Sequence, residues 1–125
     1  MRAACGKKAI ALVSAFVYND SRKNQRVVSL PDRSELEFEW DDEKNTANVK
    51  KHGIDFEDAI LVFNDENYIE FYDPAHSEEE DRYNIIGLVE DVLFVVYTER
   101  KQRIRIISAR LATAMERRMY YDRNA

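Results

Sequence analysis

The sequence predicts an α+β domain in which helices pack on an antiparallel sheet. Helix start and stop signals fall between residues 41 and 64, four strand-like runs follow one another after residue 66, and a capping box precedes a last helical segment. This order is typical of a sheet with helices packed on it. We expect a sheet of about four to five strands, with two N-terminal helices and one C-terminal helix.

The first expected elements are a short strand and two helices. The residues of "LEFEW", 36–40, alternate between apolar and charged, as on a strand with one buried face. Asp41 or Asp42 is then placed to cap a helix, which ends where a glycine follows His52. Asp55 caps a second helix. The apolar residues of that helix recur at helical spacing and are Phe56, Ala59, Ile60 and Phe63.

Four strand-like runs rich in Ile, Val, Tyr and Phe come next. They are "NYIEFYD", "RYNIIGLVE", "VLFVVYTER" and "RIRIISARL". The links at residues 90–91 and 101–102 are short, so consecutive strands are expected to pair as antiparallel hairpins. A longer acidic loop, "PAHSEEED", separates the first two runs. Thr113 and Glu116 form a capping box at the start of the final helix.

The first 36 residues differ from the rest of the chain. They carry seven cations and three acids and show no sustained period of either 3.6 or 2, which indicates a tail or linker. We therefore divide the chain into an N-terminal extension, residues 1–36, which is expected to be flexible or to reflect a start codon set too early, and a domain of residues 37–125. The opening "MRAACGKKAIALVSA" has features of a secretory signal, but Lys7 and Lys8 directly abut its short apolar run.

Charge is distributed unevenly along this acidic chain. The net charge is −5, yet residues 100–123 hold eight cations and two acids, whereas residues 37–99 hold four cations and nineteen acids. A negative net charge speaks against nucleic-acid binding, because affinity for phosphate comes mainly from cations. A chain polarised in this way can still present a basic face to one partner and an acidic face to another.

Several function classes find no support in the sequence. His52 and His76 match no metal-ligand spacing, and the single Cys5 excludes an internal disulfide and a cysteine metal cluster. Acidic clusters such as "SEEED" are more typical of solvated loops than of metal sites. No phosphate-binding glycine motif and no G-x-S-x-G occurs, and no run is long enough to span a bilayer. We therefore expect no metal, no cofactor and no membrane partner.

The arginine-rich segment is the best candidate for chemistry. Strand alternation places Arg103 and Arg105 on one face, and Arg100 and Arg110 lie close enough in the chain to join them. Guanidinium groups bind phosphate through paired donors and keep their charge, which suits them to stabilise a phosphorane-like transition state. Tyr120 and Tyr121 on the last helix, or Tyr97, are candidates for stacking on bases. Composition alone favours a simpler interpretation, in which these arginines lie on a solvated face and pair with the many acids.

The first helix offers a second polar group. Lys44, Asn48 and Lys51 fall at i, i+4 and i+7 on one face, and His52 lies beside them. The helix dipole favours a charged histidine at this C-terminus, so His52 is placed as well to cap the helix as to act as an acid.

Four segments carry a family resemblance: "FEWDDEKNTANVKKHGIDFEDAILVF", "AHSEEEDRYNIIG", "VVYTER" and "IRIISARLATAMERRMYY". In order and spacing they resemble the BrnT family of toxins from bacterial type II toxin–antitoxin systems, over about residues 38 to 121. The resemblance implies a RelE-like fold and a cytoplasmic, metal-independent endoribonuclease that cuts messenger RNA and slows growth. It also implies a cognate BrnA-like antitoxin with a ribbon-helix-helix part, which neutralises the toxin and brings the pair to operator DNA.

The resemblance implies an RNA site built around the arginines. We expect the ribose 2′-hydroxyl to attack the adjacent phosphate, leaving a 2′,3′-cyclic phosphate and a free 5′-hydroxyl, which needs a base, an acid and positive charge. Glu99 or His52 would be the base, and His52 or Lys51 the acid. The expected catalytic residues are Arg82, Arg100, Arg105, Glu99, His52 and Lys51. The expected RNA-binding residues are Lys44, Arg103, Arg110, Arg117 and Tyr120. One departure from the family is that Glu90-Asp91 stands where a glycine or a basic residue is expected.

Two other interpretations fit the sequence. In the first, the chain is an antitoxin-binding module whose nuclease site is idle and which acts only in autoregulation of its operon. Intact RNA after incubation at high protein concentration would indicate that module. In the second, the chain is an exported acidic protein whose first 15 residues are a signal, and the mature chain would begin at Phe16.

Overall fold

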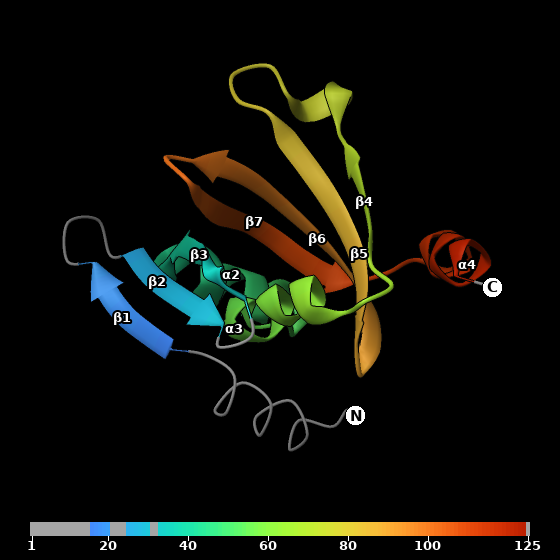
Figure 1. Ribbon diagram of the computed structural model, residues 1–125, viewed down its shortest axis with the longest axis horizontal. Helices are drawn as coiled ribbons and strands as arrows, with labels where there is room; N and C mark the ends of the chain where they lie inside the picture. Colours follow the sequence, from blue (N-terminus) through green and yellow to red (C-terminus); the bar gives the residue numbers. More distant parts are fainter. Residues whose placement is uncertain (1–15, 21–24, 31–32, 125) are drawn as a thin grey trace.

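A computed structural model of the chain describes residues 16–20, 25–30 and 33–124. Cys5 and the segment considered as a secretory signal lie outside these residues. In the described part, seven strands form one sheet in the order β1-β2-β3-β7-β6-β5-β4 (Figure 1). The strands are β1 (Phe16–Asp20), β2 (Gln25–Leu30), β3 (Arg33–Asp41), β4 (Ile69–Tyr72), β5 (Arg82–Val89), β6 (Asp91–Arg100) and β7 (Arg103–Leu111).

The sheet is mixed, which corrects the expectation of an antiparallel sheet with four to five strands. Strands β4 to β7 pair consecutively and antiparallel, as predicted, with short links between β5, β6 and β7 and the longer acidic loop between β4 and β5. Strand β3 instead runs parallel to β7 and pairs with it through Glu37, Phe38 and Glu39. Parallel neighbours need a long crossover, which the helices and hairpins between β3 and β7 provide. The turn residues Glu90, Lys101 and Gln102 adopt positive φ, as tight hairpins require.

The helices begin and end near the expected residues. They are α2 (Asp42–His52), α3 (Phe56–Ala59) and α4 (Ala114–Arg123), with the 3₁₀ helices η1 (Ile60–Asn64) and η2 (Pro74–His76). The Asp41 side chain caps α2, and Gly53 ends it with a φ of 74°. The capping box of Thr113 and Glu116 is present at α4. Two details differ from the expectation: α2 and α3 follow three strands, and the second helix is one α-helical turn continued as 3₁₀.

The segment before residue 37 contains β1, β2 and the start of β3, where irregular structure was expected. Strand β2 pairs with β1 on one side and with β3 on the other, so both extend the sheet. The side chains of Val27, Val28 and Leu30 are fully buried. Val28 and Leu30 belong to the main core, so at these residues the chain is part of the folded unit. The division of the chain into an extension of residues 1–36 and a domain of residues 37–125 stays a prediction.

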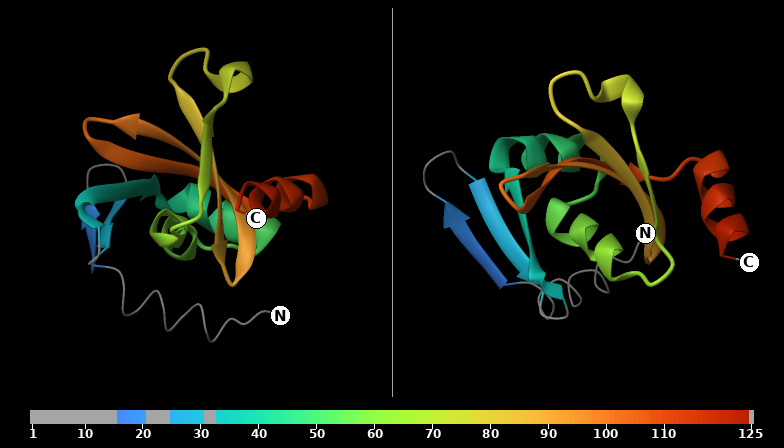
Figure 2. Two further views of the ribbon diagram at one scale, coloured as in Figure 1. Left: turned by 45° about the vertical axis from the view of Figure 1, so that its right-hand side comes forward. Right: turned by 45° about the horizontal axis from the view of Figure 1, so that its top comes forward.

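The two faces of the sheet are covered differently. The main core packs α3 and η1 against one face, which we call the helix-covered face. On the other, the open face, a smaller cluster seats α4 through Tyr120 against Ile69, Ile86 and Val92. Strand β5 accordingly runs between α4 and α3 in Figure 1 and in the right-hand view of Figure 2. No helix in the described residues is long and apolar enough to cross a membrane.

A bulge in β7 decides which of its side chains reach the open face. Tyr97 pairs with Ile106 but Val96 pairs with Ser108, so Ile107 is an extra residue in β7. Unbroken alternation would place Ser108 and Arg110 on the face opposite Arg105. The extra residue reverses this and brings both onto the open face.

Candidate functional site

Five arginines on three strands have their side chains on the open face. We call Arg82, Arg100, Arg103, Arg105 and Arg110 the arginine cluster. In the sheet register Arg100 lies opposite Arg103, and Thr98 lies between Arg105 and Arg82. Paired residues on neighbouring strands have their side chains on the same face, so the guanidinium groups of Arg82, Arg100, Arg103 and Arg105 gather in one region, and Arg110 lies on the same face beyond Ser108. All five were expected from the sequence, but the bulge that adds Arg110 was not.

Two glutamates of β3 hold the cluster from one side. Glu39 contacts Arg105 Nη1 through Oε2 at 2.8 Å and Arg103 Nη1 through Oε1 at 3.4 Å. Glu37 Oε1 accepts a hydrogen bond from Arg103 Nε at 3.0 Å. Glu39 is only 6% exposed, so its charge is compensated by the two arginines rather than by water. Neither glutamate was among the expected site residues, although their alternation in "LEFEW" places them on one face.

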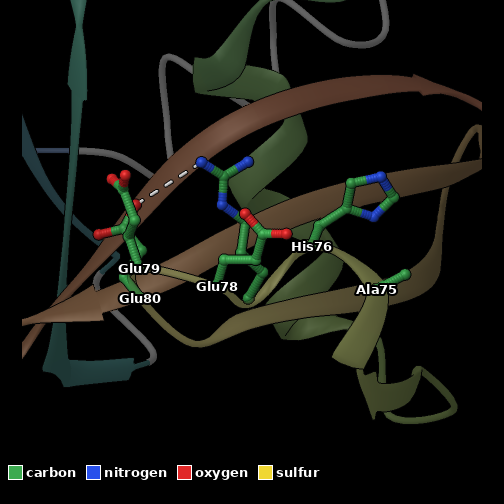
Figure 3. Close-up of a pocket in the computed structure, with 6 residues that line it drawn as sticks. Ala75, His76, Glu78, Glu79 and Glu80 are labelled. Carbon is green, nitrogen blue, oxygen red and sulfur yellow. Dashed lines mark ion pairs between the residues drawn. The ribbon is translucent and has the colours of Figure 1, made fainter.

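Glu80 holds the cluster from the other side. Its two carboxylate oxygens lie 3.2 Å from Arg100 Nη2 and 3.7 Å from Arg82 Nη2. It belongs to the acidic loop between η2 and β5, where a pocket of about 330 Å³ is also found (Figure 3). The pocket is lined by Ala75, His76, Glu78, Glu79, Glu80 and Arg82. The charged residues that line the pocket are mainly carboxylates, which repel a phosphate group. The arginine cluster beside the pocket suits a phosphate group better.

Arg110 is held by a two-point ion pair and an aromatic ring. Its Nη1 and Nη2 donate to Glu116 Oε1 and Oε2 at 2.8 and 3.0 Å, and its guanidinium lies 4.2 Å from the centre of the Phe94 ring. Burial raises the pKa of Glu116, but hydrogen bonds from Arg110 and Thr113 outweigh burial and leave that pKa below its ordinary value. Arg110 therefore ties α4 to the sheet.

The cluster keeps donors for a ligand despite these partners. A guanidinium has five N–H donors, and the contacts of Arg82 and Arg100 with Glu80 and of Arg110 with Glu116 use only some of them. The Arg100 side chain is 49% exposed, which makes it the most solvent-accessible of the five arginine side chains. The simpler interpretation from composition, that the arginines pair with acids, thus describes part of what the structure shows.

The expected acid and base residues do not lie within the cluster. Glu99 pairs with Ile104, which places its side chain on the opposite side of the sheet from Arg105. Lys51 and His52 lie in the last turn of α2, and Lys44 in its first turn. Within the described part of the chain, no hydrogen bond or ion pair joins these three residues to the arginine cluster. Their roles stay predictions that this geometry does not support.

Tyr120 is a core residue, contrary to its expected role in stacking on bases. It is 3% exposed, and its hydroxyl donates to Asp65 Oδ2 at 2.6 Å. Burial, together with that hydrogen bond, raises its pKa. A ring enclosed in this way has no free face for a base. Arg117, another expected RNA-binding residue, is exposed on α4.

Comparison with known proteins identifies the family. The family model described as "Ribonuclease toxin, BrnT, of type II toxin-antitoxin system" matches residues 40–116, more than half of the chain. This chain belongs to the BrnT family. The crystal structure of the Brucella abortus ribonuclease toxin BrnT, at 1.1 Å resolution, has 27% sequence identity and a TM-score of 0.47, with 59% of this chain and 92% of that chain covered. No curated protein matches.

Membership in the BrnT family confirms the resemblance and implies a ribonuclease toxin with a protein antitoxin as partner. The matched range contains all five arginines of the cluster and the partners Glu80 and Glu116. It begins after Glu37 and Glu39, so the carboxylates that hold Arg103 and Arg105 come from outside it. Within the described residues, no group of three or more His, Cys, Asp or Glu is arranged to hold a metal ion.

Proposed function

We propose that this BrnT family chain is a cytoplasmic toxin that cleaves messenger RNA without a metal ion. A cognate BrnA-like antitoxin with a ribbon-helix-helix part neutralises it, and the pair represses its own operon, contacting operator DNA only through the antitoxin. The observation that best supports RNA as the substrate is the gathering of five arginines on one open sheet face of an otherwise acidic chain. Such a cluster attracts a phosphate backbone locally while the remaining surface repels it.

The proposed reaction is an attack within the RNA strand. The 2′-oxygen forms a bond to the adjacent phosphorus as the bond from phosphorus to the 5′-oxygen breaks. The 2′-hydroxyl proton passes to a base, and the departing 5′-oxygen takes up a proton from water. Arg105, Arg100 and Arg82 stabilise the charge on the equatorial oxygens. Glu39 fixes Arg105 at 2.8 Å, so the guanidinium is oriented before the substrate binds.

Carboxylates on the open face are better placed than Glu99 to accept the 2′-hydroxyl proton. Glu37 and Glu80 contact arginines of the cluster, and the Glu37 side chain is 43% exposed while that of Glu80 is partly exposed. Each therefore has carboxylate surface that a ribose hydroxyl can reach. We propose these two as the candidate bases.

Cleavage of a defined RNA by the full chain in the presence of EDTA tests the proposal. Arg100→Ala and Arg105→Lys should each slow cleavage by about 100-fold, because each removes a guanidinium donor from the developing charge. Arg123→Ala, on the exposed end of α4, is the matched control and should cleave like the parent. Mass spectrometry of the products should find 2′,3′-cyclic phosphate ends. Unchanged rates in both cluster variants, at full thermal stability, would contradict this site.

A second candidate function is supported by the internal ion pairs. Every arginine of the cluster has a carboxylate partner in the folded chain, as expected of a module that binds its antitoxin without cutting RNA. RNA that stays intact at high protein concentration, while the antitoxin still binds, would favour this function.

A further inference from the structure

We propose that the open face also holds a site for an unpaired RNA base, with the Phe71 ring as its stacking surface. This inference rests on the proposed function and names the part of the substrate bound next to the arginines. Phe71 lies on β4, an edge strand of the sheet, and is 37% exposed. It replaces Tyr120, whose ring is buried.

The strand register places Phe71 beside the arginine cluster. Side chains on the open face form rows across the strands, and neighbouring rows lie about 7 Å apart. The row with Arg105 also contains Thr98 and Arg82. The next row consists of Ser108, Val96, Asn84 and Phe71. Arg82 and Asn84 lie in neighbouring rows of β5, and Asn84 pairs with Phe71, so a nucleotide whose phosphate contacts Arg82 has the Phe71 ring within reach of its base.

The Phe71 ring is held from behind by a second aromatic ring. Its centroid lies 6.4 Å from that of Phe94 at an interplanar angle of 63°, an edge-to-face contact. The guanidinium of Arg110 in turn lies over the Phe94 ring. The support fixes one side of Phe71 and leaves exposed ring surface for a ligand. Aromatic rings on an open sheet, next to cations, are a common platform for single-stranded RNA.

Asn84 adds a polar group between these rings and the arginines. It lies between Phe71 and Val96 in its row and is 7% exposed. Its Oδ1 has no hydrogen-bond partner, and buried polar atoms are rarely left in that state. An amino or imino group on the edge of a stacked base is a donor that would satisfy it. The ligand class is therefore a nucleobase attached to a phosphodiester, rather than phosphate alone.

Binding of an uncleavable RNA measures the site directly. The probe is a short fluorescent RNA with every 2′-hydroxyl methylated, compared with the same strand carrying abasic sugars. Phe71→Leu keeps an apolar side chain but removes the flat ring, and should weaken binding of the base-containing strand about 5- to 100-fold. Phe71→Trp should bind at least as well as the parent. Both variants should bind the abasic strand as the parent does.

Tyr72→Ala is the matched control, because Tyr72 is exposed on the same strand but makes an edge-to-face contact with Tyr83 on the other face. It should leave RNA binding unchanged. The base site is overturned if Phe71→Leu binds RNA like the parent and the abasic strand binds as tightly as the base-containing strand. If Arg100→Ala still weakens RNA binding in that case, the proposed function survives. If the parent binds neither strand, both fail.

Discussion

The side-chain amide of Asn48 pairs with the backbone of Ala109 as a neighbouring strand would. Asn48 Nδ2 donates to the Ala109 carbonyl at 2.8 Å, and the Ala109 amide donates to Asn48 Oδ1 at 3.2 Å. The same Nδ2 also donates to the carbonyl of Ile54 at 2.9 Å. Strand β3 pairs with β7 only as far as Arg105. Beyond that point the Asn48 amide pairs with the β7 backbone at Ala109, and this joins α2 to the sheet.

Loss of this amide should destabilise the fold. Asn48→Ala leaves the buried N–H and C=O of Ala109 without partners, which should cost about 3 kcal/mol. Urea unfolding followed by circular dichroism measures the loss. Val49→Ala, an exposed change at the next position of α2, is the control and should stay within about 0.5 kcal/mol of the parent. Equal midpoints for the two variants would show that the paired amide adds nothing.

The local signals in the sequence predicted the elements around the site. Asp41, Gly53 and Thr113 act as the helix caps that their types and positions indicated. The hairpins of β5, β6 and β7 follow from short links, so the arginines of these strands were expected near one another. What periodicity alone missed is the bulge at Ile107, because an extra residue leaves no mark in an apolar run.

The remaining differences come from contacts between distant parts of the chain. The pairing of β3 with β7 joins residues more than 60 positions apart, and only that pairing sets Glu39 beside Arg105. Tyr120 is buried because α4 folds back onto Ile86, which no local pattern indicates. Strand β2 is short, and its burial depends on β3. Such long-range packing overrides local preferences.

Gly87 should not tolerate a side chain. A Cβ at this position would lie 2.9 Å from the Val62 Cβ and 3.2 Å from its carbonyl oxygen. Gly87→Ala should therefore push η1 away from β5 and cost about 1 to 3 kcal/mol in thermal unfolding. Gly53 offers the contrast, because its φ is 74° and no atom lies within 4 Å of a Cβ there. Gly53→Asn should be milder than Gly87→Ala, since asparagine accepts the left-handed conformation; the reverse order would refute this reading.

Glu39 should matter for stability more than its neighbour Glu37. Glu39→Gln removes a buried charge from between Arg103 and Arg105, which should cost about 2 to 4 kcal/mol. Glu37→Gln changes a side chain that is 43% exposed, and should cost less than about 1 kcal/mol. Paired melts of the two variants give the comparison. Similar losses would mean that burial does not distinguish the two carboxylates.

The ion pair of Glu116 with Arg110 should make stability depend on pH. The pKa of Glu116 is lowered in the folded chain, since hydrogen bonds from Arg110 and Thr113 outweigh the opposing effect of burial. The unfolded chain then binds the proton more readily. The stability from Glu116 is therefore fully present above the ordinary pKa of 4.5 and is lost as the pH falls through the lower folded value.

Substitution at Glu116 measures this contribution. The difference in unfolding free energy between the parent and Glu116→Gln should be constant from about pH 7 to about pH 5.5, and should shrink below the ordinary glutamate value. The same substitution in an Arg110→Met background is the control, because the main hydrogen-bond donor to the carboxylate is then absent. There the difference should be smaller and change less with pH. A difference that stays the same in acid for the parent would show that Arg110 does not hold the Glu116 carboxylate in its charged form.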